Sequence, residues 1–195
     1  MVPRQRAEYL SLRREFEPTA VRLVVIAESP PASGKYFYCQ NGKMSEPLFD
    51  ALIKQLCPYP MPKTKREGLF AFQSRGWVIV DATYEPVNAL GRSARDRAIA
   101  RDYDELCNDL KRLLAGRWNE VPLVLVKRNV CKLVAPKLTH DGFNVLNAGR
   151  VVYFPSSGRQ CDFARQFCEI LMNSGGIHTS GTSSSPPYSS TPAGA

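Results

Sequence analysis

Residues 21–31 read VRLVVIAESPP, and this stretch decides the fold class. Its first seven residues are almost continuously apolar and rich in β-branched side chains, which is typical of a strand buried on both faces. Similar runs follow at residues 77–81 (WVIVD) and 122–127 (PLVLVK), and a shorter one covers residues 151–154. Because strands covered on both faces occur mostly in parallel sheets, the four runs predict a parallel sheet.

Helical periodicity separates these runs. The predicted helices cover residues 45–57, 93–115, 129–140 and 162–172, and residues 143–146 are a candidate for extra strand pairing. Strands that alternate with helices predict right-handed crossovers and helices on both faces of the sheet. We therefore expect a single-domain α/β fold, a three-layer αβα sandwich around a central four-stranded parallel sheet.

The chain divides into three segments by composition. We expect an N-terminal helix within residues 1–18 and the α/β domain at residues 19–172. Residues 173–195 contain no Lys, Arg, Asp or Glu and are rich in Ser, Gly, Thr and Pro, which predicts a disordered tail. A length of 195 residues suits one domain.

Charge and cysteine spacing limit the classes of function. The chain has 26 Lys and Arg against 18 Asp and Glu, a net charge of +8 that lies entirely in the first 172 residues. This charge is typical of a protein with an anionic partner such as nucleic acid, but also of a soluble basic protein without one. No apolar run approaches the ~20 residues of a membrane span, and the N-terminus lacks a secretory signal pattern, so the sequence predicts a soluble cytoplasmic protein without membrane contact. Six cysteines show no Cys-x-x-Cys pair, which predicts reduced thiols and no metal site.

The ends of the predicted strands carry polar residues of several kinds. Ligands bind at the carboxyl ends of parallel strands, so the informative segments are those that follow each run. These segments contain two carboxylates, small hydroxyl residues, aromatic rings and cations, at residues 27–38, 81–88, 127–129 and 155–159. The first of them contains neither Gly-x-x-x-x-Gly-Lys nor Gly-x-Gly-x-x-Gly, so no nucleotide cofactor is predicted.

Residues 27–31 (Ala-Glu-Ser-Pro-Pro) resemble the first motif of the uracil-DNA glycosylase superfamily, which follows the first strand and reads Gly-Gln-Asp-Pro-Tyr or Gly-Glu-Ala-Pro-Gly in different branches. Residues 34–37 match the spacing of the Gly-x-Pro-Phe element of the closest branch, with Tyr36 in place of proline. Asp81 stands where the family has a uracil-reading asparagine, and residues 154–157 (Phe-Pro-Ser-Ser) stand where it has His-Pro-Ser.

The resemblance implies a monofunctional DNA repair glycosylase that hydrolyses the N-glycosidic bond of uracil flipped out of DNA. It implies a monomer that acts on uracil-containing or abasic DNA, in the cytoplasm and at the nucleoid, without a metal or other cofactor. The cysteines do not reproduce the pattern of the branch with an iron–sulfur cluster, so no cluster is expected.

The resemblance also assigns a base pocket. Phe37 would stack on the flipped base, and Tyr36 or Tyr38 would exclude a 5-methyl group; alternatively, the three rings only cover the edge of the sheet. The other residues implied to contact the substrate are Ala27, Pro30, Asn129 and Phe154.

Three residues are candidates for catalysis. Glu28 and Asp81 are carboxylates that could stabilise the developing sugar cation or orient water, and Ser29 stands in the place of a water-activating aspartate. Glu28 could instead be a loop carboxylate paired with an arginine. Asp81 could read the base, act as the catalytic carboxylate, or support a turn; an ionised aspartate only accepts hydrogen bonds, so reading O4 of uracil would require its protonated form.

Residues 154–157 depart most from the family, because Phe154 cannot donate the hydrogen bond that a histidine gives to the uracil oxyanion. A backbone N–H, Ser156, Ser157 or Asn129 would have to replace it. The residues expected to contact DNA are Pro155, Ser156, Ser157, Gly158, Arg159 and Gln160, of which the last two could equally be the exposed start of a helix. Two other functions remain open: a non-catalytic binder of damaged or abasic DNA, and a glycosylase for another base, such as hypoxanthine or mismatched thymine.

Overall fold

The structure is a computed structural model that describes residues 5–156 and 158–174. Its described part forms one sheet of three strands, β1 (Leu23–Ala27), β2 (Trp77–Asp81) and β3 (Leu123–Leu125), in the order β2-β1-β3. Both neighbouring pairs are parallel, and Ala27 pairs with Asp81 at the carboxyl end. The α/β class and the parallel sheet are therefore confirmed, and the two carboxylate-bearing strand ends lie next to each other.

The prediction of a fourth strand is wrong. Residues 151–156 have no regular secondary structure, and the outer side of β3 is occupied by residues 144–147. Leu123 donates to the carbonyl of Asn144 at 2.8 Å, and the fully buried side-chain amide of Asn147 exchanges two hydrogen bonds with the backbone of Leu125, at 2.9 Å each. The proposed extra pairing at residues 143–146 is thus a single bridge between Leu123 and Val145. An amide side chain completes the ladder that a fourth strand would have supplied.

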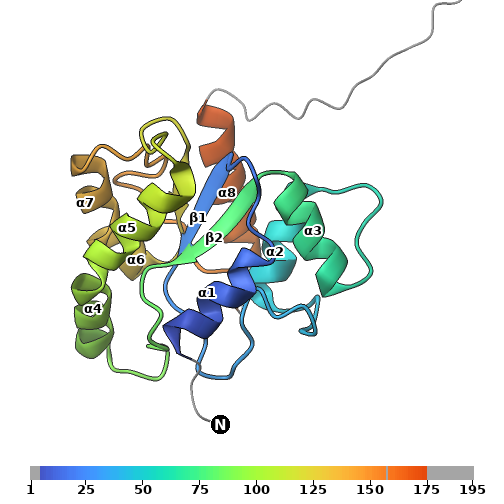
Figure 1. Cartoon of the computed structure of the whole chain (residues 1–195), viewed down its shortest axis with the longest axis horizontal. Helices are drawn as coiled ribbons and strands as arrows, with labels where there is room; N and C mark the ends of the chain where they lie inside the picture. The colour runs from blue at the N-terminus through green and yellow to red at the C-terminus, as the bar shows by residue number, and fades with distance from the viewer. Residues whose placement is uncertain (1–4, 157, 175–195) are drawn as a thin grey trace, which may run out of the picture.

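Helices cover both faces of the sheet, as Figure 1 shows. One layer consists of α1 (Arg6–Arg14), α2 (Pro47–Leu56), α3 (Lys65–Ser74) and α8 (Gln160–Asn173). The other consists of α4 (Arg92–Arg101), α5 (Tyr103–Leu114), α6 (Arg128–Leu133) and α7 (Ala135–His140). Alternate strand residues pack into two separate cores, Val25 with the first layer and Val24 with the second. The burial of both strand faces explains why the runs are continuously apolar.

Two predicted helices are each divided in two. The helix expected at residues 93–115 is interrupted at Asp102, whose carboxylate accepts a 2.5 Å hydrogen bond from Thr83 in the loop after β2. The helix expected at residues 129–140 is interrupted at Val134, two residues before Pro136. Proline has no N–H to donate into the preceding turn, so a continuous helix would lose a hydrogen bond there.

Of the three helices that the structure describes before β2, two were predicted and α3 was not. The N-terminal helix expected within residues 1–18 covers Arg6–Arg14. Helix α3 was not predicted, although it has a recognisable start: the Thr64 side chain accepts a hydrogen bond from the backbone N–H of Glu67 at 3.2 Å. A Thr-x-x-Glu sequence is a known helix N-terminal signal. The predicted tail lies outside the described residues from position 175 onward.

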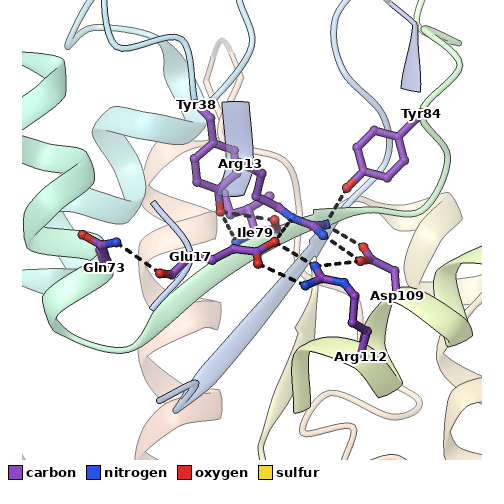
Figure 2. Close-up of polar contacts among 8 residues, drawn as sticks. All are labelled: Arg13, Glu17, Tyr38, Gln73, Ile79, Tyr84, Asp109 and Arg112. Atoms are coloured by element: carbon purple, nitrogen blue, oxygen red, sulfur yellow. Dashed lines mark hydrogen bonds and ion pairs between the residues drawn. The ribbon is translucent and has the colours of Figure 1, made fainter. Parts of the chain in front are cut away.

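The outer edge of β2 is closed by side chains (Figure 2). The hydroxyl of Tyr38 accepts a hydrogen bond from the N–H of Ile79 at 2.7 Å and donates one to the carbonyl of Ile79 at 3.2 Å. Arg13 of α1 and Asp109 of α5 come from opposite helical layers and form a bidentate ion pair with two 2.6 Å hydrogen bonds. Together these contacts satisfy and cover an edge that would otherwise be open to pairing with another strand.

Tyr38→Phe is expected to lower the free energy of unfolding by about 1–3 kcal/mol, because both backbone groups of Ile79 lose their buried partner. Urea denaturation would measure the change. Tyr59→Phe is the matched control, since Tyr59 is fully exposed and its replacement should leave stability unchanged. Equal stability of the two variants would show that the Tyr38 hydroxyl does not stabilise the edge.

Candidate functional site

A cavity of about 300 Å³ lies at the carboxyl ends of the strands. This volume is at the low end of the range for small-molecule sites. The loop after β1 supplies most of one wall, and the start of α2 closes another. The lining residues are Ala27, Glu28, Ser29, Pro30, Pro31, Ser33, Lys35, Tyr36, Phe37, Glu46, Pro47, Leu48, Phe49, Ile79, Asp81, Asn88, Lys127 and Phe154. Three strand ends and the segment after Val152 therefore meet at one site.

Glu28 is buried in the cavity wall and is held by three neighbours. Oε2 accepts a hydrogen bond from the Lys127 ammonium, and Oε1 accepts one from the side-chain amide of Asn129 at 2.6 Å. The guanidinium of Arg95, on α4, lies 3.8 Å from Oε1. The alternative that Glu28 pairs with an arginine is thus correct, but it does not remove the carboxylate from the cavity. A carboxylate has about four acceptor positions, so Glu28 can still accept a hydrogen bond from a water molecule or a sugar.

Lys127 ends the run at residues 122–127 and belongs to the segment 127–129 that was expected at this edge, but no role was assigned to it. Its ammonium contacts Glu28, 99 positions away in the sequence. Asn129 was predicted to contact the substrate, and its side-chain amide donates a hydrogen bond to the same Glu28 carboxylate. Its Oδ1 is buried without a hydrogen-bond partner among the described residues.

Asp81 is the second carboxyl group, and its environment differs from that of Glu28. Its side chain is buried, and Oδ2 has no hydrogen-bond partner in the described part of the chain. Burial raises the pKa of Asp81 from 3.8 to about 7, although the Arg13 cation and the Tyr36 hydroxyl act in the opposite direction. The cavity thus contains one carboxyl group paired with cations and one whose pKa is raised by burial.

The raised pKa of Asp81 has a consequence for stability. Between about pH 4 and pH 7 the folded chain retains a proton that the unfolded chain has lost, so the free energy of unfolding falls as the pH rises through this window. The slope for one proton is at most about 1.4 kcal/mol per pH unit. Asp81→Asn should lack this fall, so its stability relative to the unaltered chain should increase from pH 4 to pH 7 in urea denaturation series. A constant difference between the two proteins would contradict the assignment.

The three consecutive aromatic residues have different positions. Phe37 and Tyr36 line the cavity, whereas Tyr38 closes the edge of β2 and is absent from the described wall. Phe37 is 7% exposed, and its ring packs against those of Phe49 and Phe72 at centroid distances of 5.2 and 5.3 Å. The alternative of edge covering therefore holds for Tyr38, while Phe37 presents one side of a rigid aromatic cluster to the cavity.

The loops after β1 and β2 are tied together beside the cavity. The Ser29 hydroxyl accepts a hydrogen bond from the N–H of Val87 at 3.3 Å, and the Asn88 side chain accepts one from the N–H of Ala32 at 2.8 Å. Ala27, Ser29 and Pro30 all lie in the wall, as the sequence analysis expected. The Ser29 hydroxyl proton is left free to donate into the site, since these contacts use only its oxygen as acceptor.

The segment that follows Val152 reaches the cavity only in part. Phe154 lines it, with no donor group on its side chain. Pro155 is buried, and Ser156, Gly158, Arg159 and Gln160 are exposed, outside the described cavity wall, while Ser157 lies outside the described residues. Arg159 lies over the ring of Tyr153 at 4.5 Å and bonds Asp162 at 2.8 Å, and Gln160 is the first residue of α8. The interpretation of Arg159 and Gln160 as the exposed start of a helix is therefore correct. Their exposure leaves both side chains accessible to a partner.

One buried ion pair at the cavity was also missed. Glu46 lines the wall just before α2, and it accepts a 2.6 Å hydrogen bond from Lys65, whose side chain is fully buried and also bonds the carbonyl of Tyr36 at 2.9 Å. Lys65 thereby fixes the aromatic segment to α3. Within residues 5–156 and 158–174 no cluster of three His, Cys, Asp or Glu side chains is arranged to hold a metal, and no helix is both long and apolar enough to cross a membrane.

Comparisons of the chain with protein family models, with curated proteins and with solved structures found no match. The resemblance to uracil-DNA glycosylases therefore stays a prediction from the motifs, and the site must be interpreted from its own chemistry.

Proposed function

We propose that the protein is a DNA repair glycosylase that excises uracil flipped into the cavity at the carboxyl end of the sheet. The observation that carries the proposal is Asp81: a buried carboxyl group with an unpartnered oxygen and a pKa near 7, at the cavity wall. A protonated carboxyl group offers one donor and one acceptor. These match O4 and N3–H of uracil, the same pair of contacts that an asparagine side chain would make.

The remaining groups have roles that follow from their positions. Phe37 is the stacking surface for the flipped base, since its ring lines the cavity and is immobilised by Phe49 and Phe72. Glu28 is the carboxylate that stabilises the oxocarbenium-like sugar and orients the attacking water. The Ser29 hydroxyl and the Lys127 ammonium are donors in the same wall. Both can donate hydrogen bonds to the departing uracil anion, which the Phe154 side chain cannot do.

Cations beside the cavity supply contacts for DNA phosphates. Lys35 is an exposed residue of the cavity wall, and Arg92 and Arg97 are exposed on α4 next to a shallow hollow. Phosphate contacts of this kind orient the duplex without reading its sequence. Binding through such contacts should weaken steeply with added salt.

An excision assay tests the proposal. The purified chain is incubated with duplexes that contain one uracil, one hypoxanthine, one thymine mismatch or no lesion, and strand cleavage after alkali reports the released base. We expect cleavage at uracil and loss of this cleavage in Asp81→Leu, which keeps the size but not the polar contacts. If the chain neither cleaves uracil DNA nor binds it more tightly than undamaged DNA, the proposal fails.

The missing donor at Phe154 favours a second candidate, a binder of damaged or abasic DNA without catalysis. The same duplexes in a gel-shift assay separate the two functions. Tight binding to uracil or abasic DNA without cleavage would support the binder and exclude the glycosylase.

The pH dependence distinguishes the two possible roles of Asp81. If the protonated form reads the base, uracil excision should decline as the pH rises through about 7, and Asp81→Asn should remain active without this decline. The measurement is the single-turnover rate from about pH 5.5 to pH 9 for both proteins. A rate that instead rises through pH 7 would show that ionised Asp81 acts as the general base.

A further inference from the structure

Lys127 has the position of a nucleophile as well as that of an ion-pair partner. Among the described residues, two lysines line the cavity, Lys35 and Lys127, and only Lys127 contacts a carboxylate of the wall. Its side chain is 29% exposed, so the ammonium group is paired with Glu28 and still accessible from the cavity. An amine in contact with a proton acceptor and open to a substrate is the arrangement that Schiff-base chemistry requires.

The backbone at Lys127 is unusual for a residue with a side chain. Its φ is 87° and its ψ is 134°, far from strand or helix values, and its N–H donates to the carbonyl of Val152 at 2.8 Å. A non-glycine residue in this region is strained and persists only where surrounding contacts hold it. Strain of this kind concentrates at functional sites, and here it accompanies the placement of Lys127 against Glu28.

Lys127 and Glu28 are arranged as a hydrogen-bonded donor and acceptor. Glu28 Oε2 receives the Lys127 hydrogen bond, while Oε1 faces Arg95 and Asn129. When Lys127 passes a proton to Oε2, the net charge of the site does not change and the Arg95 guanidinium keeps its charge. The acceptor that frees the amine is therefore the group already bonded to it.

We propose that Lys127 forms a Schiff base with the aldehyde of an abasic site and that the protein cleaves the DNA strand there. This inference rests on the proposed function, because uracil excision would produce the abasic sugar in the same cavity. It adds an activity to that function, since hydrolysis of the N-glycosidic bond alone leaves the strand intact.

The reaction balances with the groups present. Lys127 gives one proton to Glu28, and its neutral Nζ adds to the C1′ carbonyl carbon of the ring-opened sugar. The C1′ oxygen takes one proton from the nitrogen and one from Glu28 and leaves as water, which creates an iminium ion. The Glu28 carboxylate then removes a C2′ proton; that electron pair becomes the C2′=C3′ bond, and the C3′–O3′ pair leaves with the phosphate. Water hydrolyses the iminium and restores the Lys127 ammonium, and Glu28 passes the C2′ proton to the departing phosphate, which restores the carboxylate.

Borohydride trapping tests this proposal independently of uracil excision. The unaltered protein is mixed with a synthetic duplex that contains one preformed abasic aldehyde, and borohydride reduces any iminium to a stable protein–DNA cross-link. We expect a cross-link whose peptide map places the adduct on Lys127, together with strand cleavage without alkali when borohydride is omitted. A duplex with a tetrahydrofuran analogue, which cannot open to an aldehyde, should give neither product.

Two lysine variants provide the matched comparison. Lys127→Arg keeps a cation for Glu28 and should lose the cross-link, whereas Lys54→Arg, at a lysine that pairs with Asp50 on α2 outside the described cavity wall, should retain it. Absence of a cross-link at saturating abasic DNA, or a cross-link that persists in Lys127→Arg, overturns the proposal. The adduct site in the unaltered protein gives the same answer if Lys127→Arg fails to fold. Uracil excision without trapping would refute this inference alone, and trapping without uracil excision would refute the proposed glycosylase alone.

Discussion

Glu28→Gln is expected to excise uracil about 10²- to 10⁴-fold more slowly than the unaltered chain, which is the usual contribution of a positioned acid–base group. Glutamine has nearly the same shape and retains an oxygen for the Asn129 amide, but it removes the negative charge that faces the sugar. The loss should appear in the single-turnover rate, whereas affinity for uracil DNA should change little, because the positive charge that develops on the sugar exists mainly in the transition state.

Glu85→Gln is the matched control for that experiment. Glu85 also follows a strand of the sheet and pairs with an arginine, Arg101 at 2.8 Å, but it is exposed and lies outside the described wall of the cavity. Its replacement should leave the excision rate unchanged. If Glu28→Gln cleaves at the rate of Glu85→Gln, Glu28 has no part in the reaction, and the ionised form of Asp81 becomes the remaining carboxylate in the site.

Arg13→Ala is expected to lower the free energy of unfolding by about 3–5 kcal/mol, the usual cost of breaking a buried ion pair. The Arg13 side chain has no exposed surface and donates to Asp109, Glu17 and the Tyr84 hydroxyl (Figure 2). Burial alone would raise the pKa of Asp109, but the hydrogen bonds and charge of Arg13 outweigh it and lower this pKa. Without Arg13, the buried carboxylate of Asp109 would keep only the longer, 3.3 Å contact with the half-exposed Arg112.

Arg6→Ala provides a control on the same pair of helices. Arg6 of α1 bonds Glu105 of α5 at 3.0 Å, but both side chains are about half exposed. Surface pairs of this kind contribute about 1 kcal/mol or less. Urea denaturation of both variants would compare a buried with an exposed link between α1 and α5. Similar losses for the two would mean that burial does not determine the contribution of Arg13.

The strands were predictable because their signal is local. β2 has the predicted bounds, and β1 and β3 lie within their predicted runs, since a strand buried on both faces must be apolar at consecutive positions. The fourth run has the same apolar character but is not a strand. The position beside β3 that a fourth strand would take is filled by the side chain of Asn147. No periodicity in the sequence indicates that a side-chain amide will replace a strand.

The helices show where local patterns are incomplete. The start of helix α3 has a local signal in the sequence, the capping residue Thr64. The break at Asp102 has no such local signal, because it depends on a hydrogen bond to Thr83 in a different loop. Contacts between residues distant in the sequence therefore decide where one helix ends and the next begins. The residue types near a helix terminus decide only whether a helix can begin there.

The sequence by itself determined the α/β class, the parallel strands and the convergence of Glu28 and Asp81, since the carboxyl ends of neighbouring parallel strands meet at one edge. Only the tertiary structure decided the chemical state of these two groups. Glu28 is paired because Lys127 and Asn129 approach it from β3 and α6, and Asp81 has a pKa near 7 because the surrounding layers exclude water from it. Proton affinity depends on burial and on charges a few ångströms away, and these distances exist only once the chain has folded.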